Sequence, residues 1–106
     1  MDEVISKLRK FRDERDWKQF HNPKDLALAL SIESSELLEA FLWKSAEDAD
    51  VEKVKEELAD VFAYALLLAE HYELDIRQIV LEKIAQNQKK YPVHKAKGSA
   101  KKYTEL

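Results

Sequence analysis

"EELADVFAYALLLA", residues 56–69, constrains the fold most, because residues 61–69 are apolar on every side at helical spacing. A helix that is apolar all round is buried all round. The few other helices that a chain of 106 residues can form would scarcely cover it. We therefore expect a homo-oligomer. The alternative is a monomer that leaves this apolar central helix partly uncovered.

Two pairs of acidic residues flank the apolar stripes of consecutive predicted helices. Glu57 and Asp60 lie one turn apart, beside the stripe of the helix that contains residues 56–69. Glu33 and Glu36, in "SIESSELLEAFLW" (residues 31–43), have nearly the same offsets from the stripe of the preceding helix. The two stripes consist of Val54, Leu58, Val61, Ala65 and Leu68, and of Leu26, Leu30, Leu37 and Phe41. Helices joined by a short connection pack antiparallel, so the two pairs should meet across one groove.

Four converging carboxylates need a positive partner, because each partly buried, unpaired charge costs on the order of several kcal/mol. Neither stretch offers Lys or Arg at a matching position on its stripe. Oxygen ligands favour Mg²⁺, with Mn²⁺ as a substitute, over zinc or copper. The alternative is a solvated flank in which the acids pair with Lys44, Lys53 or Lys55. A di-iron site is not expected, because no His follows a Glu by three residues.

The cap signals predict an all-α, four-helix-bundle-like fold with antiparallel helices. The first helix covers residues 2–15, and the second begins at the Asn22 cap and Pro23 and runs to about Lys44. The third runs to about Tyr72 and is capped either by Ser45 with Asp48 or by Asp50. The fourth opens at a capping box of Asp75 with Gln78 and stops before Pro92.

The composition narrows the class of protein. The chain has one Gly, two Pro and no Cys, so a disulfide framework, thiolate chemistry and a Cys metal site are excluded. No apolar run has the length of a membrane span or the form of a signal peptide, and we expect a soluble, cytoplasmic protein that binds no membrane. The whole chain carries −3 and the lysines of residues 89–102 carry +6, so the remainder carries −9. A uniformly basic nucleic-acid binder is not expected, whereas metal ions and phosphates would suit this distribution.

The last predicted helix places hydrogen-bond donors on its inward face. Its stripe is formed by Ile76, Ile79, Val80 and Ile84. Lys83 and Asn87 fall in the middle of this stripe, with Lys90 at its margin and Tyr91 following. Burying such donors without hydrogen-bond partners costs free energy. A polyphosphate held by a bound cation would supply the acceptors. The alternative is that Lys83 extends to solvent or pairs with an acidic residue.

Taken together, these motifs resemble the MazG-like all-α nucleoside triphosphate pyrophosphatases, whose pattern is ExxE, a spacer, ExxD, and then Lys and Asn on the last helix. This chain has Glu33-Ser-Ser-Glu36, Glu57-Leu-Ala-Asp60, Lys83 and Asn87. The subgroup of small dCTP pyrophosphatases is suggested by "RDWKQFHNP", "FLWK", "NQKKYP" and "KKYTEL". The resemblance covers residues from about 11 to 106.

The resemblance implies a role for each group of residues. The Mg²⁺ ligands would be Glu33, Glu36, Glu57 and Asp60. The phosphate or sugar contacts would be Lys83, Asn87, Lys90 and Tyr91. The base would be enclosed by Trp17, His21, Trp43 and Tyr64, which suits the stacking of aromatic rings on bases. Leu8 departs from the subgroup, which has a polar His there that lines the base pocket, so the base preference stays open.

The implied activity is Mg²⁺-dependent hydrolysis of a dNTP, with dCTP or a modified dCTP favoured, to dNMP and pyrophosphate. Mg²⁺ would activate a water, and Glu36 is the expected general base. The resemblance also implies a role in clearing non-standard nucleotides and a dimer of dimers. We expect a pyrophosphohydrolase domain over residues 1–92 and a basic tail over residues 93–106, mobile or ordered by a neighbouring subunit. The alternatives are the same chemistry on dUTP or dATP, and a non-catalytic helical interaction module.

Overall fold

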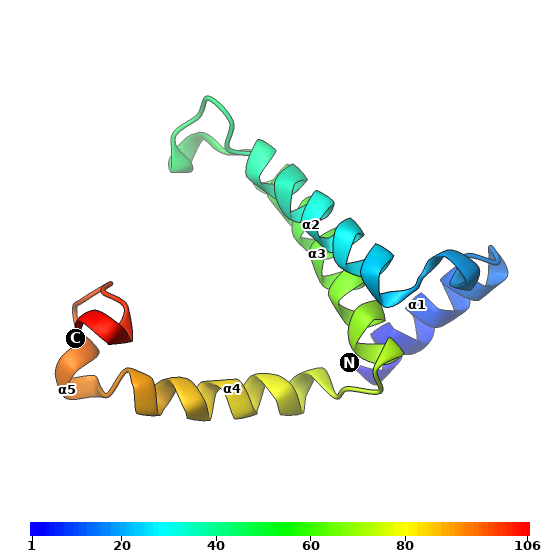
Figure 1. Cartoon of the computed structure of the whole chain (residues 1–106). Coiled ribbons are helices and arrows are strands. Elements are labelled where there is room, and N and C mark those ends of the chain that lie inside the picture. Colours follow the sequence, from blue (N-terminus) through cyan, green and yellow to red (C-terminus); the bar gives the residue numbers. More distant parts are fainter. The chain divides into compact units, whose positions relative to one another are not determined.

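The computed structural model describes residues 1–106, and its regular elements are all helices, as predicted (Figure 1). The contacts divide the chain into two compact units, Met1–Glu73 and Leu74–Leu106. The first contains α1 (Asp2–Glu14), η1 (Lys18–Phe20), α2 (Pro23–Glu39), η2 (Ala46–Asp48) and α3 (Val51–His71). The second contains α4 (Ile76–Lys90), α5 (Val93–Ala96) and η3 (Tyr103–Glu105). None of the helices is both long and apolar enough to cross a membrane.

In the first unit, α2 and α3 lie side by side and antiparallel, and α1 packs against α3 (Figure 1). The core consists of Leu26, Ala40, Leu66, Leu67 and Ala69. The apolar run on α3 is therefore buried at its C-terminal end, while Phe62 in the same run is 57% exposed. A single chain thus leaves part of this helix open, and the homo-oligomer stays a prediction.

The start of α2 confirms the predicted cap. The Asn22 side chain accepts a hydrogen bond from the backbone N–H of Asp25 at 2.9 Å and donates one to the Asp25 carboxylate at 2.6 Å. Pro23 occupies the first helical position, where its missing N–H costs nothing. This cap orients the helix that carries Glu33 and Glu36.

The end of α2 differs from the prediction, because the helix stops at Glu39 rather than near Lys44. The N–H groups of Ala40, Phe41 and Leu42 each bond to the carbonyl three residues earlier, which tightens the chain beyond an α-helix. Trp43 then has a φ of 61°, in the left-handed region that ends a helix. Phe41 and Leu42 extend the apolar pattern of the helix in the sequence, but both lie beyond its end in the structure.

The starts of α3 and α4 use aspartate caps. Asp50 accepts from the N–H of Glu52 at 3.0 Å, so it is Asp50 rather than Ser45 that caps α3. Asp75 accepts from the N–H of Gln78 at 3.1 Å, as predicted. The Gln78 side chain, however, donates to Glu82 at 3.0 Å, so no reciprocal capping box forms at this end.

Candidate functional site

Three of the four predicted metal ligands lie together between α2 and α3. Glu33 and Glu36 on α2 and Glu57 on α3 each place a carboxylate oxygen within 4.8 Å of the other two. Glu57 is buried, and the two glutamates of α2 are half-buried. We call these three residues the acid cluster. Their convergence follows from the three-residue spacing on α2 and the antiparallel packing of the two helices.

Burial and the neighbouring carboxylates both act on Glu33. Burial, followed by the hydrogen bond and charge of Glu36 and the charges of Asp60 and Glu57, raises the pKa of Glu33 to about 7. Asp60 is exposed and outside the three-residue group, yet it lies near enough to contribute to this shift. Glu36 therefore lies close to Glu33 within the acid cluster.

Lys53 compensates part of this negative charge. Its Nζ lies 2.8 Å from Glu57 Oε1, one turn away on α3, and this hydrogen bond lowers the pKa of Glu57. The pairing is one that the solvated-flank interpretation allowed. It reaches only one oxygen, however, because Glu57 Oε2 and Glu33 Oε2 are buried without a hydrogen-bond partner.

These two oxygens are the observation that tests whether a metal fits. Buried carboxylate oxygens without partners are costly, and a cation between them would satisfy both. The donor set is entirely oxygen, which suits a hard divalent cation. The residues present therefore fit a metal ion held between α2 and α3.

A cavity of about 350 Å³ brings together three of the four predicted base-binding residues. Trp17, His21 and Tyr64 line it with Phe11, and we call it the aromatic cavity. The Phe11 and Trp17 rings meet edge to face at 5.7 Å, and those of His21 and Tyr64 at 6.4 Å. The remaining lining residues are Leu8, Arg12, Asp60, Ala63 and Leu67.

The aromatic cavity adjoins the acid cluster. Asp60 lines the cavity, and its charge raises the pKa of Glu33. Tyr64, which also lines the cavity, is close enough to the acid cluster to be affected by its charge. Burial first, and then the charges of Glu33, Asp60 and Glu36, raise the pKa of Tyr64. Trp43 does not line this cavity, and it is 94% exposed beyond the end of α2.

The predicted phosphate contacts belong to the unit Leu74–Leu106. Lys83 and Asn87 line one groove of α4, which is completed by Ile79, Val80 and Ile84. Their shared face confirms the helical register on which the sequence argument relied. Lys90 Nζ lies 5.0 Å from the centre of the Tyr103 ring, which also meets Tyr91 edge to face at 5.9 Å.

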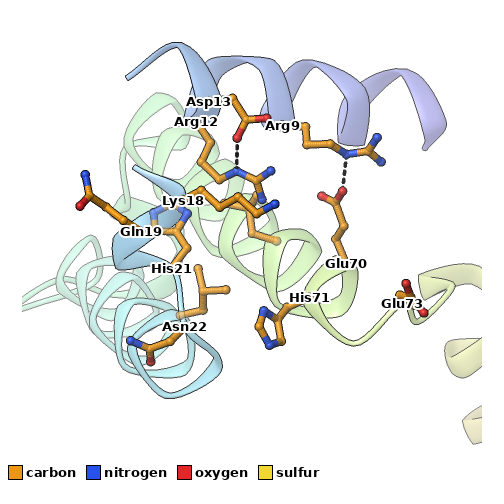
Figure 2. A pocket seen from close by; sticks show the side chains of 12 residues that line it. Arg9, Arg12, Asp13, Lys18, Gln19, His21, Asn22, Glu70, His71 and Glu73 are labelled. Carbon is orange, nitrogen blue, oxygen red and sulfur yellow. Dashed lines mark hydrogen bonds and ion pairs between the residues drawn. The ribbon is translucent and has the colours of Figure 1, made fainter. Parts of the chain in front are cut away.

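A buried arginine that the sequence patterns did not predict lies next to the aromatic cavity. Arg12 on α1 is only 9% exposed, and it lines both the aromatic cavity and a second cavity of about 570 Å³ (Figure 2). The signal was present, because Ile5, Leu8 and Arg12 share one face of α1 at spacings of three and four residues. An arginine on an apolar face needs a partner, and Asp13 supplies one at 2.9 Å.

The pKa of Glu33 predicts how stability depends on pH in metal-free protein. At pH below 4.5 Glu33 is protonated in both states, but between 4.5 and about 7 the unfolded chain releases this proton while the folded chain keeps it. The free energy of unfolding should therefore fall across this window relative to Glu33→Gln, which has no proton to release. Urea unfolding of both proteins with chelator present measures the difference. A difference that is flat or rises with pH would contradict this assignment.

The comparisons with known proteins identify the family of this chain. The MazG-like family model matches residues 28–106. The chain is 43% identical over 104 residues to dCTP pyrophosphatase 1 of Mus musculus and 41% identical to that of Homo sapiens. Each alignment covers 91% of this chain, which spans only 61% of the length of these relatives. The crystal structure of a pyrophosphatase from Archaeoglobus fulgidus has a TM-score of 0.79 and 41% identity, covering 87% of this chain and 92% of that one. The chain therefore belongs to the MazG-like family.

Proposed function

We propose that this protein is a Mg²⁺-dependent nucleoside triphosphate pyrophosphohydrolase. It cleaves a dNTP between the α- and β-phosphates, with dCTP or a modified dCTP favoured, and releases dNMP and pyrophosphate. The observation that carries the proposal is the acid cluster, with two buried carboxylate oxygens lacking partners, next to an aromatic cavity. The names of the curated relatives and of the archaeal pyrophosphatase support the same reaction.

In this proposal the carboxylates hold the metal and one of them moves a proton. Glu33, Glu36 and Glu57 bind Mg²⁺, and the nearby Asp60 completes the set. Bound Mg²⁺ neutralises phosphate charge and lowers the pKa of water. Glu36 accepts the proton of the attacking water from its place in the acid cluster. Lys53 keeps Glu57 ionised through the 2.8 Å contact and so preserves a metal ligand.

The aromatic cavity binds the base. Trp17, His21 and Tyr64 offer ring faces and edges on which a base stacks away from water. Since Asp60 lines this cavity, a base bound there would have its phosphates directed toward the acid cluster. Trp43 lies outside the cavity, and it contributes to base binding only if a second subunit in the proposed dimer of dimers presents it.

The residues of α4 and its C-terminal end bind the phosphates and the sugar. Lys83 and Asn87 donate hydrogen bonds from one groove, and Lys90 adds a second cation. The packing of Tyr91 and Lys90 against Tyr103 supports a defined arrangement of this end of the unit. Clearing non-standard nucleotides from the cellular pool is the purpose we assign to the reaction.

Product analysis with a nucleotide panel tests the proposed reaction. We expect purified protein with Mg²⁺ to convert dCTP to dCMP and pyrophosphate in equal amounts, with lower rates for dUTP, dATP and dGTP. Anion-exchange chromatography separates dCMP from dCDP and so reports which bond breaks. Formation of dCDP and inorganic phosphate would contradict cleavage between the α- and β-phosphates.

The same panel separates the alternatives. A higher kcat/KM for dUTP or dATP would keep the chemistry and correct the substrate. No product from any nucleotide, with a helical circular dichroism spectrum, would overturn the enzyme in favour of a helical interaction module.

A further inference from the structure

We propose that Arg12 recognises the base in the aromatic cavity and selects one that presents two adjacent hydrogen-bond acceptors, as cytosine does at N3 and O2. This inference rests on the proposed function, because it assigns a specificity-determining residue to the base site. It concerns a cation of α1 that is distinct from the predicted metal, phosphate and base-binding residues.

The Arg12 side chain lies at the wall of the aromatic cavity. Its side chain is almost completely buried between α1 and α3, and it lines the aromatic cavity together with Trp17, His21 and Tyr64. Figure 2, which draws the second cavity, shows the Arg12 side chain extending from α1 toward the segment that carries Lys18 and His21. Burying a guanidinium destabilises the folded state unless a partner balances its charge and its N–H groups find acceptors.

The Arg12 guanidinium makes one side-chain hydrogen bond within the chain. Its Nε donates to Asp13 Oδ1 at 2.9 Å, and the half-exposed carboxylate of Asp13 balances the charge. The guanidinium has five N–H donors in a rigid plane, and its other donors make no hydrogen bond to the chain. Asp13 therefore holds the group in place and leaves its outer edge free for a ligand.

Two other residues that line the aromatic cavity are Leu8 and His21. Leu8 is apolar and offers no hydrogen bond. Burial, followed by the charge of Arg12, lowers the pKa of His21, and its buried Nδ1 has no partner. Arg12 is the only arginine or lysine in the lining, and it is an obligatory donor.

The chemistry of the bases determines what such a donor selects. A guanidinium edge makes two parallel hydrogen bonds to two neighbouring acceptors. Cytosine offers N3 and O2, and guanine offers O6 and N7. Uracil carries a hydrogen on N3, and adenine places a donor, its N6 amino group, beside N7. We assign cytosine, because dCTP is the substrate favoured in the proposed function, and dGTP becomes an arm of the test.

The test compares Arg12→Lys with a matched control. Lysine keeps the charge and much of the aliphatic stem but loses the planar pair of donors. Arg9→Lys is the control, because Arg9 lies on the same helix, pairs with Glu70 and lines the second cavity but not the aromatic cavity (Figure 2). We expect Arg12→Lys to lower the ratio of kcat/KM for dCTP to that for dUTP by about ten- to a hundredfold. The Arg9 variant should leave this ratio unchanged.

A second variant covers the case in which Arg12→Lys does not fold. Asp13→Asn changes a half-exposed residue and removes the anchor of the guanidinium, and it should lower the same ratio by a smaller factor. An unchanged ratio, or an equal loss for dCTP, dUTP, dGTP and dATP, would overturn the inference, because a packing role affects all substrates alike. A wild-type ratio that favours dGTP and falls in the variants would overturn the choice of cytosine.

Calorimetric binding of dCMP and dUMP separates this inference from the proposed function. If the wild type prefers dCMP and Arg12→Lys abolishes this preference, the inference is supported, even if the wild type releases no pyrophosphate. The absence of pyrophosphate release would overturn only the proposed catalysis. Equal binding of dCMP and dUMP by the wild type would overturn the inference while leaving pyrophosphate release as a separate result.

Discussion

The Glu57→Gln variant is expected to lose at least about a hundredfold in turnover and in Mg²⁺ affinity, because removing even an outer partner of a metal ligand costs roughly 10- to 100-fold. Glutamine keeps the shape of the side chain but removes the negative charge from the buried, unpartnered Oε2. It also releases Lys53, whose Nζ then places an uncompensated positive charge near the metal. Steady-state release of pyrophosphate and calorimetric titration with Mg²⁺ measure the two losses.

Glu56→Gln provides the matched control. Glu56 precedes Glu57 on α3, has the same chemistry and is exposed, so its replacement should leave turnover and affinity unchanged. Equal behaviour of the two variants would contradict a metal-binding role for Glu57. A protein whose Glu57→Gln variant folds and keeps every measurable property would fit an interaction module instead.

Removal of divalent metal is expected to reduce hydrolysis to the uncatalysed background and to lower the melting temperature. Without a cation, the three carboxylates of Glu33, Glu36 and Glu57, which lie within 4.8 Å of one another, have only the Lys53 contact to balance their charge. A ligand that binds only the folded state stabilises it by about 2.7 kcal/mol at a hundredfold excess over its Kd. Activity and thermal unfolding before and after treatment with EDTA, and after restoring Mg²⁺, give the measurement.

The Glu57→Gln variant serves as the control here too. Its melting temperature should respond much less to Mg²⁺ than that of the wild type. Hydrolysis that persists in excess EDTA, or a melting temperature that Mg²⁺ leaves unchanged in the wild type, would contradict a metal-filled acid cluster.

The starts of the helices could be predicted because they depend on neighbouring residues. Asn22, Asp50 and Asp75 each accept a hydrogen bond from an N–H two or three residues later. The end of α2 could not be predicted in the same way. Phe41 continues the apolar pattern, but the chain leaves the helix through tight turns and the left-handed Trp43, and no glycine or proline marks that point.

The acid cluster could be predicted because helical spacing and antiparallel packing are both visible in the sequence. The partners of its long side chains could not. Lys53 lies one turn before Glu57, and only the side-chain conformation decides whether it pairs with Glu57 or extends to solvent. The spacing of Ile5, Leu8 and Arg12 places Arg12 on an apolar face of α1, but its burial beside the aromatic cavity depends on how α1 packs against α3, which the sequence does not specify.

Diffraction from crystals grown with Mn²⁺, recorded near the manganese absorption edge, tests the central claim most directly. We expect an anomalous peak between α2 and α3 from a manganese ion that carboxylate oxygens of Glu33, Glu36 and Glu57 bind. A map without a peak at this position, with Lys53 Nζ bridging the carboxylates instead, would contradict it.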